Sequence, residues 1–116
     1  TPYQYDLSCG CGTFGKNKYS NAPVQTSMPL AAKICENYKN YINKYTFGGG
    51  NYNGVSTEQN KCYTVKTDKA SFTLLSVFGG NKPVHVGHYA YSLLTGQSSG
   101  GDVDAELKEI PCPTSP

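Results

Sequence analysis

The chain contains no arginine and no tryptophan, and only 16% of its residues are charged. All ten basic residues are therefore lysines, and the formal net charge is only +2. Proteins that bind nucleic acid mainly by electrostatic attraction are usually much more basic, so this balance argues against that class. The chain also lacks an apolar run of about 18 residues, which argues against a membrane-spanning helix.

Tyrosines, phenylalanines and cysteines take the place of the scarce aliphatic side chains. The 116 residues include 10 Tyr, 4 Phe and 5 Cys, enough for one modest core. We therefore expect a single domain over residues 1–116. Five cysteines in so small a domain favour a secreted protein, and we expect a monomer. The first residue is Thr1 rather than methionine, which fits either removal of a signal peptide or a shortened chain.

The most regular pattern lies in residues 27–45, SMPLAAKICENYKNYINKY. Apolar side chains recur there at steps of three and four, from Leu30 to Tyr45, which is typical of an amphipathic helix. Pro29 is compatible with the first turn, and the three glycines at 48–50 would follow the helix end. The pattern predicts one helix against which the rest of the domain packs.

Strand-like segments dominate the second half of the chain. Residues 61–67, 71–78, 84–94 and 105–110 are β-prone or alternate in polarity, whereas residues 47–60 are typical of a long polar loop. Tyrosines and phenylalanine near the N-terminus indicate two short strands, carried by Tyr3, Tyr5, Phe14 and Tyr19. The order predicts an α+β domain with one amphipathic helix on a mainly four-stranded antiparallel sheet, plus a short N-terminal hairpin.

The cysteines are expected to form two disulfides and leave one thiol, and the sequence alone does not choose the pairs. They are Cys9, Cys11, Cys35, Cys62 and Cys112. We favour a bond from Cys112 to Cys9 or Cys11, because closing nearly the whole chain restricts the unfolded state most, and a second bond from Cys35 to Cys62. The alternative is a metal site, but Cys9 and Cys11 are one residue apart without a second matching pair, so no metal is expected.

The order of elements resembles that of the small secreted fungal ribonucleases that cleave after guanosine. Residues 8–20 look like their opening strands, and the helix at 27–45 has the same place. Residues 45–47 and 51–54 are similar to their catalytic loop, residues 84–96 to the strand and turn that follow it, and Cys112 to their closing cysteine. The resemblance implies a ribonuclease-like fold.

The catalytic groups of that family are missing from the matched positions. Phe47 occupies the place of the loop histidine, residues 63–65 contain no glutamate, and the stretch from Tyr89 to Cys112 contains no histidine. The arginine that would stabilise the transition state is absent from the whole chain. We therefore expect a pseudoenzyme with no catalytic residue and no cofactor.

A rebuilt active site is the alternative to the pseudoenzyme. His85 and His88 flank Gly87, and a bulge at this glycine would bring both imidazoles to one face of a strand, near Lys82. General acid–base catalysis requires the two groups to lie within mutual reach, and a strand histidine pair is more often structural. We rank an active ribonuclease second.

A ribonuclease-like scaffold without catalytic groups is similar to the secreted virulence effectors of plant-pathogenic fungi. The resemblance implies an effector or avirulence protein, translocated into host cells, that binds RNA or a host protein such as an immune receptor. The candidate contact residues are Tyr45, Phe47, Tyr52, Tyr63, Lys82, His85 and His88. A cell-wall or carbohydrate-associated domain is a further alternative, since tyrosines stack on sugars. We expect Tyr38, Tyr41, Tyr89 and Tyr91 to pack mostly in the core.

Overall fold

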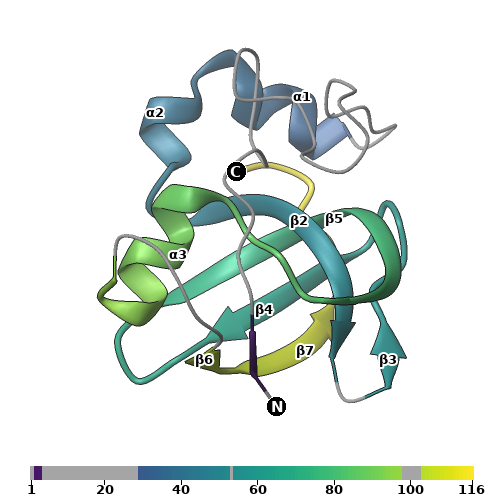
Figure 1. Ribbon diagram of the computed structural model, residues 1–116. Coiled ribbons are helices and arrows are strands. Elements are labelled where there is room, and N and C mark those ends of the chain that lie inside the picture. The colour runs from purple at the N-terminus through teal and green to yellow at the C-terminus, as the bar shows by residue number, and fades with distance from the viewer. Residues whose placement is uncertain (1, 4–28, 53, 98–102) are drawn as a thin grey trace.

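The computed structural model describes residues 2–3, 29–52, 54–97 and 103–116 (Figure 1). Its elements are β1 (Pro2–Tyr3), α1 (Pro29–Glu36), α2 (Tyr38–Tyr41), β2 (Tyr45–Tyr52), β3 (Val55–Ser56), β4 (Cys62–Lys66), β5 (Ser71–Pro83), α3 (His88–Thr95), β6 (Val103–Asp104) and β7 (Glu106–Ile110). The expectations for Tyr5, Cys9, Cys11, Phe14 and Tyr19 lie outside these residues. Of the expected N-terminal hairpin, the described residues include only β1, which pairs with the distant β6, so the hairpin stays a prediction.

The main sheet has five strands in the order β3-β2-β5-β4-β7. The pair β2–β5 is parallel, and the pairs β2–β3, β4–β5 and β4–β7 are antiparallel. The α+β class is confirmed, but the expected antiparallel sheet is wrong because the sheet is mixed. The strands expected at 61–67, 71–78 and 105–110 are present as β4, β5 and β7, with β5 continuing to Pro83.

The expected loop at 47–60 is wrong because its glycines form the middle of β2. Gly48, Gly49 and Gly50 are buried, and β2 lies beside β5 with register shifts on either side of Gly49. A Cβ atom at position 48 would overlap the backbone carbonyl of His85. Glycine is required here for the close approach of two backbones rather than for a turn.

The single helix expected at 27–45 is also wrong, since it divides into two. Asn37 lies between α1 and α2 with φ −139° and ψ 52°, which is outside the helical region. Leu30 and Ile34 are buried as the periodicity predicted, but Tyr45 is already the first residue of β2. The apolar periodicity continued past the end of the helices because the side chain of Tyr45, although in a strand, packs in the same cluster as Leu30 and Ile34.

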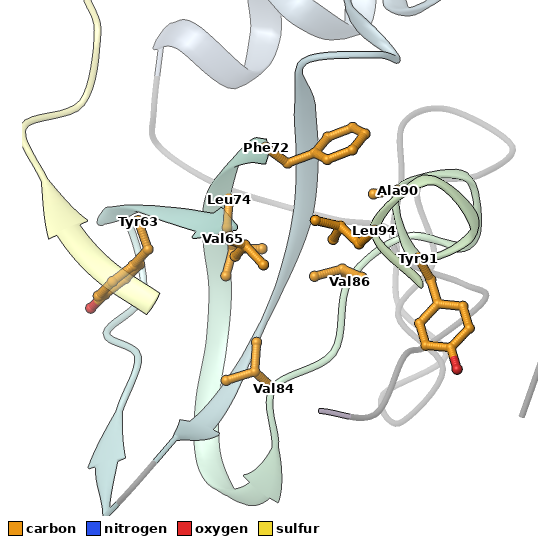
Figure 2. Packing of buried hydrophobic residues seen from close by; sticks show 9 residues of the cluster. All are labelled: Tyr63, Val65, Phe72, Leu74, Val84, Val86, Ala90, Tyr91 and Leu94. Carbon is orange, nitrogen blue, oxygen red and sulfur yellow. The ribbon is translucent and has the colours of Figure 1, made fainter. Parts of the chain in front are cut away.

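The two faces of the sheet bury separate clusters, one beneath α1 and one beneath α3. Adjacent residues of a strand point to opposite faces, so Cys62 and Leu75 belong to the first cluster while Tyr63 and Leu74 belong to the second. The α1 cluster comprises Leu30, Ala31, Ile34, Tyr45, Phe47, Cys62 and Leu75. The α3 cluster, drawn in Figure 2, comprises Tyr63, Val65, Phe72, Leu74, Val84, Val86, Ala90, Tyr91 and Leu94.

The strand expected at 84–94 is wrong beyond its first residues. His85 makes an isolated bridge to Gly49, and the chain then enters α3 at His88. Gly96 ends this helix in the left-handed conformation, at φ 75°, and its N–H donates to the carbonyl of Ser92. A helix places Tyr91 in the core and Tyr89 on the surface, with exposed fractions of 1% and 44%. Tyr89 is therefore an exception to the expectation that most of these tyrosines pack in the core.

The disulfide that the structure describes joins Cys62 to Cys112, with their Cα atoms 5.1 Å apart. The favoured pairing, Cys112 with Cys9 or Cys11 and Cys35 with Cys62, is therefore wrong. β4 and β7 are antiparallel neighbours in which Cys62 lies opposite Ile110, so the chain just beyond β7 returns to Cys62. In the part of the chain that is described, no helix is long and apolar enough to cross a membrane.

Candidate functional site

Four of the seven predicted contact residues lie in the interior. Tyr45, Phe47 and Tyr63 are 6%, 3% and 4% exposed, and His85 is 1% exposed. The hydroxyl of Tyr63 accepts a hydrogen bond from the Glu58 N–H at 2.9 Å, which satisfies its polar end. These side chains pack in the interior of the fold. The predicted contact of a partner with them is untested, and their burial does not favour it.

The other three predicted residues are placed by their backbone positions. Tyr52 ends β2 and Lys82 is near the end of β5, and these two ends lie side by side because Asn51 pairs with Pro83. His88 begins α3 instead of continuing a strand with His85. The expected bulge that would bring the two imidazoles to one strand face is therefore wrong, since α3 begins at His88.

The candidate site is the outer face of α3, which we call the α3 surface and define as Tyr89, Ser92 and Leu93. Tyr89 and Leu93 are the large apolar side chains that stay exposed among the described residues, at 44% and 39%. They are four positions apart, so a helix brings them together on one face. The Ser92 hydroxyl donates to the Tyr89 carbonyl at 2.7 Å, so its hydrogen is already used within the helix.

The helix that carries this surface is held at both ends by threonine hydroxyls. Before its first turn, the Gly87 N–H donates to Thr46 Oγ1 of β2 at 2.8 Å. At its last turn, the Thr67 hydroxyl of the β4–β5 connection donates to the Leu94 carbonyl at 2.6 Å. Between them, Ala90 and Leu94 face the strands, as Figure 2 shows. The α3 surface is therefore presented by a fixed helix rather than by a loop, which lowers the ordering cost of binding.

The chemistry of the α3 surface is apolar and uncharged. The helix His88–Thr95, HYAYSLLT, has no acidic residue in its first turn and no basic residue in its last. An exposed aromatic ring beside a leucine suits the apolar centre of a protein interface, where tyrosine is enriched. It does not suit a phosphate backbone, which requires cations.

One small cavity lies in the described part of the fold, and it is too small for a substrate. A cavity of about 10 Å³ lies between α3 and β4, lined by Tyr91, Leu94 and Val65. This volume is near the minimum for a single water molecule. Among the described residues, no three His, Cys, Asp or Glu side chains gather as a metal site would require.

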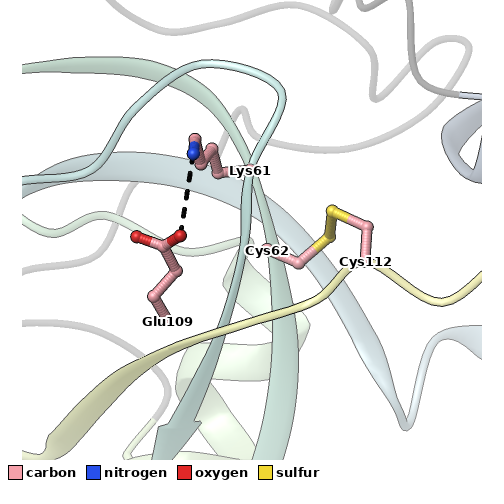
Figure 3. The surroundings of a disulfide bond; sticks show 4 residues. All are labelled: Lys61, Cys62, Glu109 and Cys112. Atoms are coloured by element: carbon pink, nitrogen blue, oxygen red, sulfur yellow. Dashed lines mark ion pairs between the residues drawn. A yellow bond between two sulfur atoms is a disulfide. The ribbon is translucent and has the colours of Figure 1, made fainter.

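The ion pairs that the structure records are on the surface. Lys61 Nζ lies 3.7 Å from a Glu109 carboxylate oxygen, as drawn in Figure 3. It also lies 3.5 Å from a carboxylate oxygen of Glu58. The Glu109 charge, followed by that of Glu58, raises the pKa of Lys61 above its ordinary value. The side chains are exposed, so solvent screens the attraction.

Sequence reasoning missed the α3 surface because residues 84–94 were interpreted as a strand. The signal was present: Ala90, Tyr91 and Leu94 recur at helical steps, and Gly96 is placed as a C-terminal stop. A run rich in Val, Tyr and Leu is ambiguous between a helix and a strand when periodicity is read over so few residues.

No family model matches the chain, and no curated protein matches it. Among solved structures, the chain is similar to the solution structure of the fungal elicitor cerato-platanin, with a TM-score of 0.51 and 18% sequence identity. The match covers 95% of this chain and 92% of cerato-platanin. It overturns the resemblance to guanosine-cleaving ribonucleases: the sheet is mixed rather than antiparallel, and helix α3 stands where that resemblance placed a strand. The chain shares its fold with the fungal elicitor cerato-platanin.

Proposed function

We propose that the protein is a secreted fungal effector of the elicitor kind, which acts by binding a host protein through the α3 surface. The observation that carries the proposal is the fold shared with a fungal elicitor over nearly the whole chain. The disulfide between Cys62 and Cys112 supports secretion, since such bonds persist in oxidising environments.

Binding without catalysis is the second part of the proposal. General acid–base work needs a titratable group that substrate can reach, and the imidazole of His85 is enclosed in the fold. Tyr45, which the sequence placed in a catalytic loop, is buried at the start of β2 and is likewise out of reach of a substrate. The burial of His85 and Tyr45 favours a protein that binds a partner at its surface over one that catalyses a reaction with these residues.

A host protein is a better partner for the α3 surface than RNA. RNA binding releases counterions from phosphates and requires lysine or arginine at the contact, and α3 carries neither. Tyr89 and Leu93 instead offer apolar area that a protein partner would remove from water. A host immune receptor is one partner of this class.

The test is to apply purified, oxidised protein to leaves of a panel of plant genotypes and to score cell death and the oxidative burst. The double variant Tyr89→Ser/Leu93→Ser should lose at least about tenfold in potency, as expected for two interface anchors. Lys108→Ser, an exposed change on β7, is the matched control and should keep full potency.

The two parts of the proposal fail differently. If wild-type protein elicits no response in any genotype, the elicitor function is wrong. If the response is strong and the double variant retains it, the elicitor function stands and the α3 surface is not the contact. If the purified protein binds RNA and this binding weakens steeply as the salt concentration rises, RNA is the partner instead.

A further inference from the structure

The last strand of the main sheet, β7, lies at the edge of the sheet next to β4 (Figure 1). Its other edge faces no described strand, so the backbone N–H and C=O groups on that side have no ladder partner among the described strands. The three charged side chains of β7 are exposed and its two apolar side chains are half-buried. The edge of β7 is therefore accessible to another strand.

The geometry of antiparallel pairing limits how a second copy of β7 can add to this edge. Residues that lie opposite each other across an antiparallel pair either both exchange backbone hydrogen bonds or both point these groups away. The outward-pointing residues of one β7 must therefore face the outward-pointing residues of the other. Because such residues alternate along a strand, a two-fold axis between two copies always places one residue opposite its own copy. Within the strand, one register exists for each of its 5 residues.

Charge and backbone chemistry disfavour all of these registers except one. Three registers place a charged residue directly opposite its own copy, and like charges in that position are destabilising. They are the registers centred on Glu106, Lys108 and Glu109. A register centred on Ile110 would bring Pro111 into the ladder, and proline has no N–H to donate. The register centred on Leu107 remains.

The register centred on Leu107 is complementary in charge. It places Glu106 of each copy opposite Lys108 of the other copy, and opposite charges in such cross-strand pairs are stabilising. Within each copy, Lys66 of β4 already lies opposite Glu106. Positive and negative side chains would therefore alternate across the junction. A lysine on an edge strand ordinarily discourages pairing, but in this register it faces a carboxylate.

We propose that the edge of β7 binds a second copy of this chain, as an antiparallel two-fold dimer in the register centred on Leu107. Leu107, which packs half-buried against the α3 cluster, then meets its own copy on the same face of the joined sheet. One short strand buries less area than a stable dimer requires, so the dimer is transient and exchanges with the monomer expected from the sequence. The dimer is independent of the proposed function.

The test measures self-association of the whole, oxidised protein by analytical ultracentrifugation, at concentrations up to about 1 mM because the association is weak. Low ionic strength is used, since salt screens exposed charges. Glu106→Lys and Lys108→Glu each replace two opposite-charge pairs of the dimer by like-charge pairs. Each variant alone should therefore associate at least about tenfold more weakly than wild type. A mixture of the two variants should associate as strongly as wild type, because every lysine then faces a glutamate.

Lys39→Glu, at an exposed position of α2, is the matched control for net charge. Alone it should associate as wild type does, although its net charge equals that of Lys108→Glu. Mixed with Glu106→Lys it should form the mixed dimer weakly, because one like-charge pair remains in the junction. The mixture of Glu106→Lys with Lys108→Glu also shows that both variants are folded, since recovery of the dimer requires both edges to be intact.

Three results would overturn the dimer. A wild-type protein that stays monomeric over the whole concentration range has no self-association through any surface. Association that is unchanged in Glu106→Lys and Lys108→Glu shows that the contact lies elsewhere on the molecule. A mixture of these two variants that associates no more strongly than either one alone excludes the register centred on Leu107.

Discussion

The α-carbon of Gly48 lies so close to the backbone carbonyl of His85 that no side chain fits at position 48. The two backbones are joined next to this point, where the Gly49 N–H donates to the His85 carbonyl at 3.1 Å and the His85 N–H donates back at 2.9 Å. This contact joins β2 to the segment that leads into α3. It thereby connects the sheet to the helix that carries Tyr89 and Leu93.

Gly48→Ala should destabilise the protein by about 3 kcal/mol, because the added methyl group forces two backbones apart in a packed interior. Equilibrium unfolding in urea measures the loss. Gly54→Ala is the control: φ is +81° there but a Cβ meets nothing within 4 Å, so only backbone strain of about 1 kcal/mol is expected. Equal losses in the two variants would contradict the close approach at Gly48.

Replacing both Cys62 and Cys112 by alanine should lower the free energy of unfolding by about 4 kcal/mol, because the bond closes a long loop in the unfolded chain. The sequence separation of the two cysteines is 50 residues. Urea denaturation of the variant and of the oxidised wild type gives the difference. A peptide digest of the oxidised protein should contain Cys62 linked to Cys112. Recovery of Cys112 linked to any other cysteine would refute the pairing.

Tyr91→Ala and Tyr89→Ala should differ strongly although the residues are two positions apart. The first leaves a cavity in the α3 cluster and should cost about 3 kcal/mol or more. The second removes an exposed ring and should change stability by about 0.5 kcal/mol or less. Thermal and urea unfolding of both variants compares them. The reverse order would mean that residues 88–95 are not the helix described above.

The Lys61 ion pairs should contribute stability that is lost at alkaline pH. The pKa of Lys61 is raised in the folded state by Glu109 and Glu58, so the contribution is fully present below the pKa of the unfolded chain and is lost as the pH rises through the folded pKa. Urea midpoints of wild type and Lys61→Met should therefore converge at strongly alkaline pH. Lys66→Met, a change at the exposed lysine that ends β4, serves as the control. A constant difference across this range would exclude an electrostatic origin.

Local patterns predicted the elements whose formation depends on neighbouring residues alone. The alternation in residues 61–67 and 105–110 predicted β4 and β7, because successive side chains of a strand point to opposite faces. Leu30 and Ile34 predicted the buried face of α1, because a helix repeats its buried positions every three to four residues. The candidate site was not found in this way. Tyr89 and Leu93 have the same residue types as the core, and only the direction of α3 separates them from Tyr91 and Leu94.

By itself, the sequence determined the α+β class, the three strands β4, β5 and β7, and a core rich in tyrosine, since each follows from composition and short-range periodicity. Only the tertiary structure decided that Gly48–Gly50 form a strand parallel to β5, that Cys62 bonds Cys112, and that Tyr89 faces solvent. The first two of these features join residues that are distant in sequence. The packing on both faces of the sheet decides which backbones come close together.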